Sequence, residues 1–433
     1  MKEKKQEEEN CMEEPISVEQ PVEPVAQPHP VFGQTFAAMR HRNFQLYFGG
    51  QLVSNVGTWM QIIAQGWVVY QIGHSETTLG LVAFASAIPI LVITPWAGVV
   101  VDRVSRRTLL IMTQTGSMLL AFALAALTFT GAAREWHIVV LAALLGVVNA
   151  FDAPARQAFV PEMVGKEDLP NAIALNSMMF NSARVLGPAL AGLLLAIIGA
   201  AWCFTLNGIS FLAVIIGLWV MELPPHRAVH NPASHWRQLI SGVQYTVRNR
   251  EMAALILISL VFSVFGISYS TLLPAFVEKV LHQGVMAYGW VTAASGLGAV
   301  SGAILLASQF GNGRRGQLLV LTNIAFPVIL VAFSFTSFYP LSLVLAYGLG
   351  LGFMMQFTTL NTLLQTRVED AFRGRVMGLY TITFFGFAPF GNLLIGFLGE
   401  KLGLGIAMTL FAVCSLILSR LVLIKIPEVQ KMY

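Results

Sequence analysis

Twelve long apolar stretches separated by short polar ones constrain this chain more than any other feature of its sequence. Each stretch is close to the roughly 20 residues that a helix needs to cross a membrane. Only 11% of the residues are charged, against about 25% in an ordinary soluble domain. We therefore predict an all-α integral membrane protein with twelve transmembrane helices. By apolar length these helices occupy residues 44–72, 77–101, 108–131, 137–153, 172–198, 201–222, 252–275, 286–309, 317–337, 339–364, 376–398 and 403–425.

The stretches form two groups of six on either side of a polar connection. We predict an N-terminal half at residues 39–222, a cytoplasmic linker at 223–250 and a C-terminal half at 251–425. A weak internal repeat suggests pseudo-symmetry, because Ser105-Arg106-Arg107 after the second helix corresponds to Gly313-Arg314-Arg315 after the eighth. Two related halves around a central site are a known plan of transporters.

The ends of the chain and the positive charges predict its orientation. Residues 1–38 are rich in Glu, Pro and Gln and cannot bury enough apolar surface to fold, so we predict a disordered tail, with a second short tail at 426–433. If both tails are cytoplasmic, 22 of the 26 Lys and Arg residues face the cytoplasm and three face outward, which follows the positive-inside rule. We therefore expect an inner-membrane protein with both termini inside.

Signals of catalysis and of metal binding are missing from the sequence. The three cysteines lie far apart, the eight histidines show no ligand spacing, and there is no phosphate-binding loop or metalloprotease motif. We therefore predict no enzyme activity, no metal and no cofactor. The excess of positive charge beyond the tail suits a membrane surface, so we expect contact with membrane lipid and none with nucleic acid.

The most specific motif lies between the second and third predicted helices. It reads Gly98-Val-Val-Val-Asp102-Arg103-Val-Ser105-Arg106-Arg107. This stretch resembles the loop signature of the major facilitator superfamily, with Ser105 in place of a glycine. The resemblance implies that these charges brace the cytoplasmic gate when the transporter faces outward, and that Gly98 allows close helix packing. The alternative is a basic loop that only sets topology.

A second motif lies within the helix at 172–198. It reads Ala183-Arg184-Val-Leu-Gly187-Pro188-Ala-Leu-Ala191-Gly192. It resembles the glycine-proline motif of drug:proton antiporters in the same superfamily, and this resemblance implies export. The alternative is ordinary packing of small residues between membrane helices.

Asp152 and Arg156 belong to a third stretch, which, together with residues 373–378, resembles the branch of bacterial exporters that includes the enterobactin exporter and macrolide efflux proteins. Asp152 has two interpretations: a proton-coupling carboxylate, or an acidic partner for Arg106. We favour the ion pair, because a carboxylate at the cytoplasmic end of a helix is less desolvated than one at mid-membrane.

The first predicted helix carries a polar face within an arc of about 120°. Its members are Gln51, Ser54, Asn55, Thr58, Gln61 and Gln65. This face must turn away from lipid, because unpaired amides cost several kcal/mol each in hydrocarbon. We interpret it as lining a central substrate cavity, together with Asn181, Asn207 and Asn361. The alternative is hydrogen bonding between helices. We assign the aromatic residues, Trp59 among them, to interfacial or packing positions.

Arg184 is the only Lys or Arg deep within a predicted helix. A charge there costs about 2.5 kcal/mol or more, so its side chain needs a protein or water-filled surrounding. We hypothesise that Arg184 contacts a polar or anionic group of the substrate, or an acidic residue such as Asp152 through water. The alternative is that it holds backbone carbonyls of a neighbouring helix.

Together these patterns predict a monomeric secondary transporter of the major facilitator type. We expect it to export a small amphipathic molecule, such as a drug-like compound or a siderophore-like metabolite, by proton-coupled alternating access. The alternatives are an uptake symporter on the same fold and a membrane sensor that does not transport.

Overall fold

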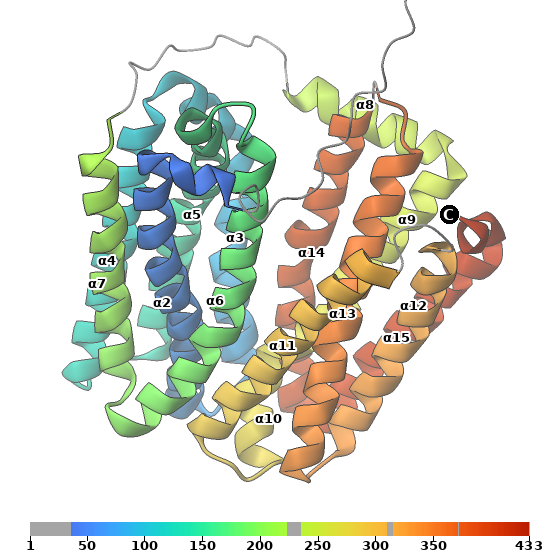
Figure 1. Ribbon diagram of the computed structural model, residues 1–433. Helices are drawn as coiled ribbons and strands as arrows, with labels where there is room; N and C mark the ends of the chain where they lie inside the picture. The colour runs from blue at the N-terminus through green and yellow to red at the C-terminus, as the bar shows by residue number, and fades with distance from the viewer. Residues whose placement is uncertain (1–35, 223–234, 310–314, 371, 433) are drawn as a thin grey trace, which may run out of the picture. The chain divides into compact units, whose positions relative to one another are not determined.

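The computed structural model describes residues 36–222, 235–309, 315–370 and 372–432, and the regular elements in these ranges are all helices (Figure 1). Residues Ala38–Tyr433 form one compact unit. The tail predicted at residues 1–38 lies, up to residue 35, outside the described residues.

Six long helices form the N-terminal half. They are α2 (Arg42–Gly73), α3 (Glu76–Arg103), α4 (Arg106–Phe129), α5 (Glu135–Val164), α6 (Leu169–Ile197) and α7 (Ala200–Val220). Five begin and end within three residues of the predicted positions. The predicted end of the fourth helix near residue 153 is wrong, because α5 continues to Val164 with Pro154 and Pro161 inside it. Proline is tolerated inside membrane helices where neighbouring groups satisfy the freed carbonyls.

The C-terminal half begins with a composite span and continues with five long helices. The span consists of α9 (Arg250–Val261), η4 (Phe262–Gly266), η5 (Ile267–Leu272) and α10 (Leu273–Lys279), and the others are α11 (Val285–Gln309), α12 (Arg315–Phe335), α13 (Tyr339–Arg367), α14 (Arg373–Leu402) and α15 (Leu404–Lys425). Eleven described spans are long and apolar enough to cross a membrane. With α2, which carries the polar face, they make the predicted twelve.

The seventh span is broken near its middle. The sequence predicted one continuous helix at 252–275, but η4 is a π-helical turn and η5 is a 3₁₀ helix. The Phe262 ring folds back over Gly266, where any side chain would collide with it, and also packs on Phe326 with ring centroids 5.0 Å apart. Such π turns are frequent at functional sites.

The predicted linker contains a further helix, α8 (His235–Arg248), which the sequence analysis described only as a polar connection. Asn249 separates it from α9, and its side chain accepts hydrogen bonds from the backbone amides of Glu251 and Met252. Tyr245 of α8 stacks on Phe372 with ring centroids 4.4 Å apart. The predicted linker is therefore packed against the C-terminal half along its second part.

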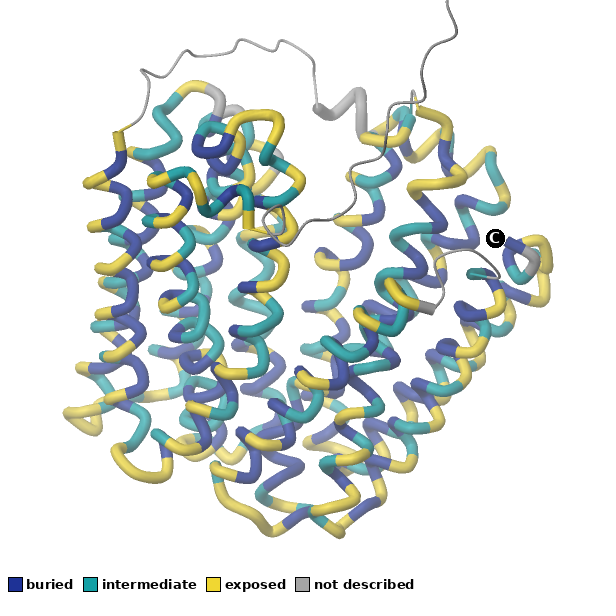
Figure 2. The backbone as a smooth tube through the Cα atoms, in the orientation of Figure 1, coloured by how far each residue is buried: buried dark blue, intermediate teal, exposed yellow. Residues whose placement is uncertain are grey.

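The two halves meet through few helices. Helix α3 packs against α14 and α6 against α11, whereas the remaining helices pack mainly within their own half. One apolar core contains Ile63 and Phe204 of the N-terminal half together with Phe276 of the C-terminal half. A second, separate core around Tyr47 and Phe159 belongs to the N-terminal half alone. Burial alternates along most helices (Figure 2).

Candidate functional site

The two ends of the bundle carry different polar contacts, and we name each end by one residue. The Glu76 end is where α2 turns into α3, and the Arg106 end is where α3 turns into α4. Because the helices alternate in direction, each end collects every second connection of the chain. The sequence motif with the arginines lies at the Arg106 end.

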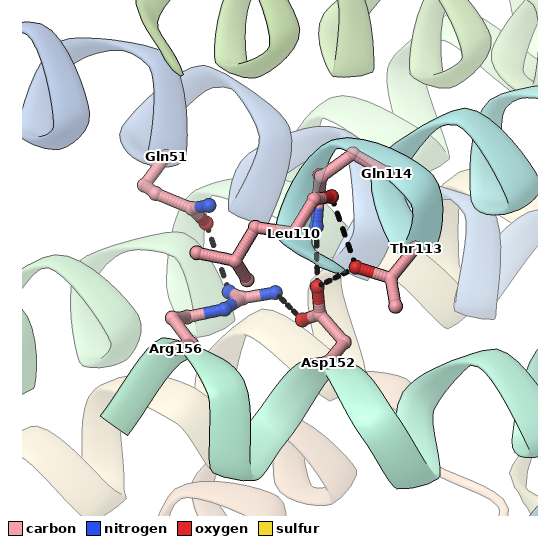
Figure 3. Close-up of polar contacts among 6 residues, drawn as sticks. All are labelled: Gln51, Leu110, Thr113, Gln114, Asp152 and Arg156. Carbon is pink, nitrogen blue, oxygen red and sulfur yellow. Dashed lines mark hydrogen bonds and ion pairs between the residues drawn. The ribbon is translucent and has the colours of Figure 1, made fainter. Parts of the chain in front are cut away.

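A buried ion pair holds three helices together within the N-terminal half (Figure 3). Asp152 of α5 pairs with Arg156 one turn further along, and the second Asp152 oxygen accepts hydrogen bonds from Thr113 Oγ1 and Gln114 Nε2, both at 2.8 Å. Arg156 also donates to Gln51 Oε1 of α2 at 2.8 Å. The Asp152 side chain is 6% exposed and that of Arg156 30%. This network joins α2, α4 and α5.

The predicted pairing of Asp152 with Arg106 is wrong. Arg106 instead pairs with Glu162 and donates to the Ala158 carbonyl at 3.2 Å. The reason is the length of α5: its extra turns carry Glu162 to the Arg106 end and leave Asp152 deeper, where Arg156 meets it.

The other arginines of the loop motif differ in their surroundings: one makes a hydrogen bond to another helix, and the other is exposed. Arg107 donates to the Trp219 carbonyl of α7 at 2.6 Å, so the arginines connect α4 to α5 and α7 inside one half. Arg103 is exposed. The side chain of Asp102 lies outside the described part of the chain.

Three residues predicted to line a cavity serve packing within the N-terminal half. Gln51, Gln61 and Asn207 are each 6% exposed or less. Gln51 accepts from Arg156, and Gln61 accepts from Asn207 Nδ2 of α7 at 2.7 Å. Their assignment to the cavity is wrong. They form the interhelical hydrogen bonds that were the alternative, because a paired amide in a membrane protein is satisfied by another helix as well as by water.

The remaining cavity candidates are half-buried. These are Asn55, Thr58, Gln65, Asn181 and Asn361. Asn181 donates to the Ser177 carbonyl of its own helix at 2.8 Å, and Asn361 accepts a hydrogen bond from Gln365. Their role as cavity residues stays a prediction.

The glycine-proline motif of α6 lies at two helix crossings. Gly187 faces Trp59 of α2, and a side chain at Gly187 would collide with the Trp59 side chain. Gly192 faces α11, where a methyl group on it would lie 3.0 Å from the Met286 carbonyl oxygen. Gly289 of α11 approaches the Pro188 carbonyl in the same way. The motif therefore brings α6 close to α2 and to the other half.

The Glu76 end joins the two halves by side chains that the sequence analysis missed. Lys279 of α10 pairs with Glu76 of α3 at 2.7 Å and lies 5.6 Å from the centre of the Tyr70 ring. Glu400 of α14 accepts from Ser75 Oγ at 2.7 Å and from the Thr77 amide at 3.1 Å. These residues are far apart in sequence, so no local spacing pointed to them. We call this group the Glu76 latch.

Helices α3 and α14 pack closely at the Glu76 end, and their contact extends to Leu91 and Gly386 near the middle of each helix. A methyl group on Gly80 would lie 2.5 Å from the Asn392 carbonyl oxygen, and Gly396 meets α3 as closely. Gly98 and Gly378 lie 18 residues along these helices, which is five full turns on the same faces and about 27 Å. No described atom lies within 4 Å of a methyl group placed on either. The packing predicted for Gly98 is therefore absent between the described atoms of this conformation.

Arg184 lies where the two halves meet. Its guanidinium carbon is 4.8 Å from the centre of the Phe353 ring of α13 and 5.9 Å from that of Trp59 of α2. It is half-buried, and Tyr269 of η5 is close enough to interact with its charge. Trp59 thus packs inside the helix bundle, which is the packing position and not the interfacial one.

The fold and these contacts define a multi-pass membrane protein with two six-helix halves that are joined through α3 with α14 and through α6 with α11. Residues 33–432 match the family described as transmembrane secretion effector. The match covers most of the chain, so the protein belongs to this family of the major facilitator superfamily. The family consists of transporters and not of enzymes, which confirms the resemblance and the fold predicted from the sequence.

Curated relatives cover nearly the whole chain at low identity. The chain is 26% identical to the staphyloferrin A transporter of Staphylococcus aureus, over 83% of this chain and 90% of that one. It is 26% identical to the multidrug efflux pump Tap of Mycolicibacterium fortuitum (86% and 94%) and 25% identical to the enterobactin exporter EntS of Shigella boydii (90% and 93%).

Solved structures share the fold. The nucleoside transporter NupG superposes with a TM-score of 0.66 at 13% identity, over 90% of this chain and 98% of that one. A bacterial homologue of the lysosomal transporter Spinster, in an inward-facing and unoccupied conformation, gives 0.64 at 13% identity, over 94% of this chain and 100% of that one.

Proposed function

We propose that this protein exports a small amphipathic molecule across the inner membrane by proton-coupled alternating access, and that it works as a monomer embedded in membrane lipid. The substrate enters between the halves from the cytoplasm and leaves on the other side. Protons move inward in exchange. We place the Arg106 end and both termini in the cytoplasm, since most Lys and Arg residues fall on that side.

The observation that carries this proposal is the unequal contact between α3 and α14. They are in contact at Gly80 and Gly396, whereas no described atom lies within 4 Å of a methyl group placed on Gly98 or Gly378. The same glycine spacing at both ends suits a rocking motion in which one pair separates as the other closes. With the Arg106 end inside, the described conformation is open to the cytoplasm.

The names of the relatives support export as the direction. Two of the three relatives named above are described as an efflux pump and an exporter, and two are named for siderophores. The motif in α6 around Gly187 resembles that of antiporters, which favours coupling to inward proton movement.

Proteoliposomes that contain the purified full-length chain test energy coupling. We expect the protein inserted inside out in these proteoliposomes to accumulate a substrate in their lumen when the lumen is acid. This accumulation should be lost when an uncoupler is added. The substrate is found first by comparing drug and siderophore levels in cells with and without the protein.

Three outcomes would contradict the proposal. Transport at the full rate without any ion gradient, but with a requirement for ATP, would remove proton coupling. Accumulation in the opposite direction would assign an uptake symporter. Absence of transport of every compound, with correctly inserted protein, would favour the sensor.

A further inference from the structure

We propose that Arg184 is the anion-binding group of the transport site, and that the site takes an amphipathic organic acid, that is, a mainly apolar or aromatic body with a carboxylate. This inference rests on the proposed function, because it assigns a substrate class to the same central site. It adds which atom receives the acid group and which surfaces receive the body.

The depth of Arg184 makes its charge expensive without a partner. The residue lies near the middle of α6, roughly 20 Å of helix from either end. At that depth a side chain cannot easily reach the water outside the membrane. A charge held there must face the protein interior or a water-filled cavity, and such residues mark ligand and ion pathways.

The described contacts of Arg184 are with aromatic rings, and they leave its N–H donors without a described acceptor. Phe353 and Trp59 lie against the guanidinium, one from each half of the protein. The N–H donors of an arginine point outward in the plane of the group, as a fork that fits a carboxylate. Among the described residues, none accepts a hydrogen bond from Arg184. The aromatic rings therefore contact the guanidinium without accepting a hydrogen bond from it.

The acidic groups that could neutralise Arg184 are already engaged. Among the described residues the ion pairs of Arg and Lys join other partners, and Asp152 is occupied by Arg156, Thr113 and Gln114. Bonding through water to Asp152, one of the two alternatives from the sequence, would therefore reach a carboxylate whose charge is already balanced by Arg156. The other alternative, bonding to carbonyls, has no described contact.

The surroundings of Arg184 offer an apolar surface that continues toward the Arg106 end. One turn along α13 from Phe353, Phe357 stacks parallel to it with centroids 6.1 Å apart. One turn before Arg184, Phe180 is 50% exposed and packs edge-on to Trp59. Asn55, one turn before Trp59, is half-buried and adds an amide. An acid held by Arg184 would thus lay its body along these rings.

Equilibrium binding with a matched pair of probes tests the inference without transport. The full-length chain in phosphatidylcholine nanodiscs is titrated calorimetrically with 2-naphthoxyacetic acid and with its neutral amide. We expect the acid to bind at least about tenfold more tightly, as for a hydrogen-bonded charge pair. Arg184→Gln should remove this preference and leave the amide within about twofold, which also reports that the variant is folded.

Two further variants give an intermediate case and a control for the preference for the acid. Arg184→Lys keeps the charge without the fork, so we expect a preference for the acid between those of the wild type and Arg184→Gln. Arg134→Gln removes one positive charge at the exposed start of α5 and should bind both probes as the wild type does.

Several results would overturn the inference. These are equal binding of acid and amide to the wild type, equal loss of both probes in Arg184→Gln, and no binding of either probe to the wild type. Loss of the preference for the acid when phosphatidylglycerol is added to the nanodiscs would assign the group to a lipid headgroup. The assay does not depend on the direction of transport or on proton coupling. The inference can therefore fail while the proposed function holds, and the proposed function can fail while the inference holds.

Discussion

The two ends of the bundle use charged residues for opposite purposes. At the Arg106 end, Arg106 pairs with Glu162 and Arg107 reaches α7, and all of these partners belong to the N-terminal half. At the Glu76 end, Glu76 pairs with Lys279 and Glu400 reaches α3, so the contacts cross from one half to the other. The first set makes one half rigid, whereas the second holds two halves in one relative position.

This difference separates contacts that transport must preserve from those it must break. In a rocking mechanism each half moves as a body, so the Asp152 network should persist through the cycle. The Glu76 latch joins bodies that separate, so it can only be of modest strength. Both carboxylates are buried, but the Lys279 side chain is 49% exposed and that of Arg156 30%, so the latch pair is more open to solvent on its basic side.

The largest expected effect comes from breaking the ion pair within the N-terminal half. Asp152→Asn leaves Arg156 with an unbalanced charge inside the helix bundle, and we expect a loss of about 3–5 kcal/mol of stability. The apparent melting temperature and the yield of monodisperse protein in detergent measure it. Asp370→Asn is the matched control, because it breaks the exposed pair with Arg373. Equal melting temperatures of the two variants would contradict the distinction between the buried and the exposed ion pair.

A pair of glycine substitutions tests whether α3 contacts α14 at each end in turn. Gly80→Leu forces a side chain into the closed contact, and we expect a cost of about 1–3 kcal/mol to this conformation. Gly98→Leu meets open space and should leave the melting temperature unchanged but reduce transport, because the side chain blocks closure of the Arg106 end. Normal transport by Gly98→Leu would show that this end never closes through these faces.

The Glu76 latch should give a smaller effect. Because Lys279 is half-exposed, the pair with Glu76 contributes about 1 kcal/mol. Lys279→Gln should therefore increase labelling of a cysteine at Thr77, in a cysteine-free background, by about fivefold. In the double variant with Glu76→Gln the two effects should not add. Additive effects would mean that the two side chains act independently.

The smallest effect is expected from the N-terminal tail. Deleting residues 1–30 should leave transport and melting temperature nearly unchanged, because a segment rich in Glu and Pro contributes little packing. This deletion touches neither end of the bundle and so serves as a baseline for the other variants. A loss of folded protein would reveal packing that the composition does not indicate.

Most of the fold could be predicted because the bilayer restricts the choices. A stretch of about 20 apolar residues has to be a helix in a membrane, since its backbone groups can only bond to each other. The helices at 44–72 and 403–425 were placed to within a few residues for this reason. The π turn at Phe262–Gly266 was not predicted, because it comes from ring packing between Phe262 and Phe326 and not from a helix-breaking residue nearby in the sequence.

The polar site was predicted by residue type but not by partner. The motif resemblances singled out Arg106 and Asp152, and the depth of Arg184 in its predicted helix singled out that charge, because a charge is costly inside a membrane. Which group neutralises each charge depends on helix length and rotation. About three extra turns of α5 sufficed to give Asp152 and Arg106 different partners, Arg156 and Glu162.

The sequence by itself therefore determined the number of helices, their arrangement in two halves and the charges of the Arg106 motif. Only the tertiary structure decided that Gln51, Gln61 and Asn207 bond between helices, that Glu76 meets Lys279, and that Phe353 and Trp59 flank Arg184. The physical reason is the distance along the sequence between the residues that interact. Crossing a membrane is a property of consecutive residues, whereas pairing a buried polar group joins residues that are often more than a hundred positions apart, and no local pattern encodes it.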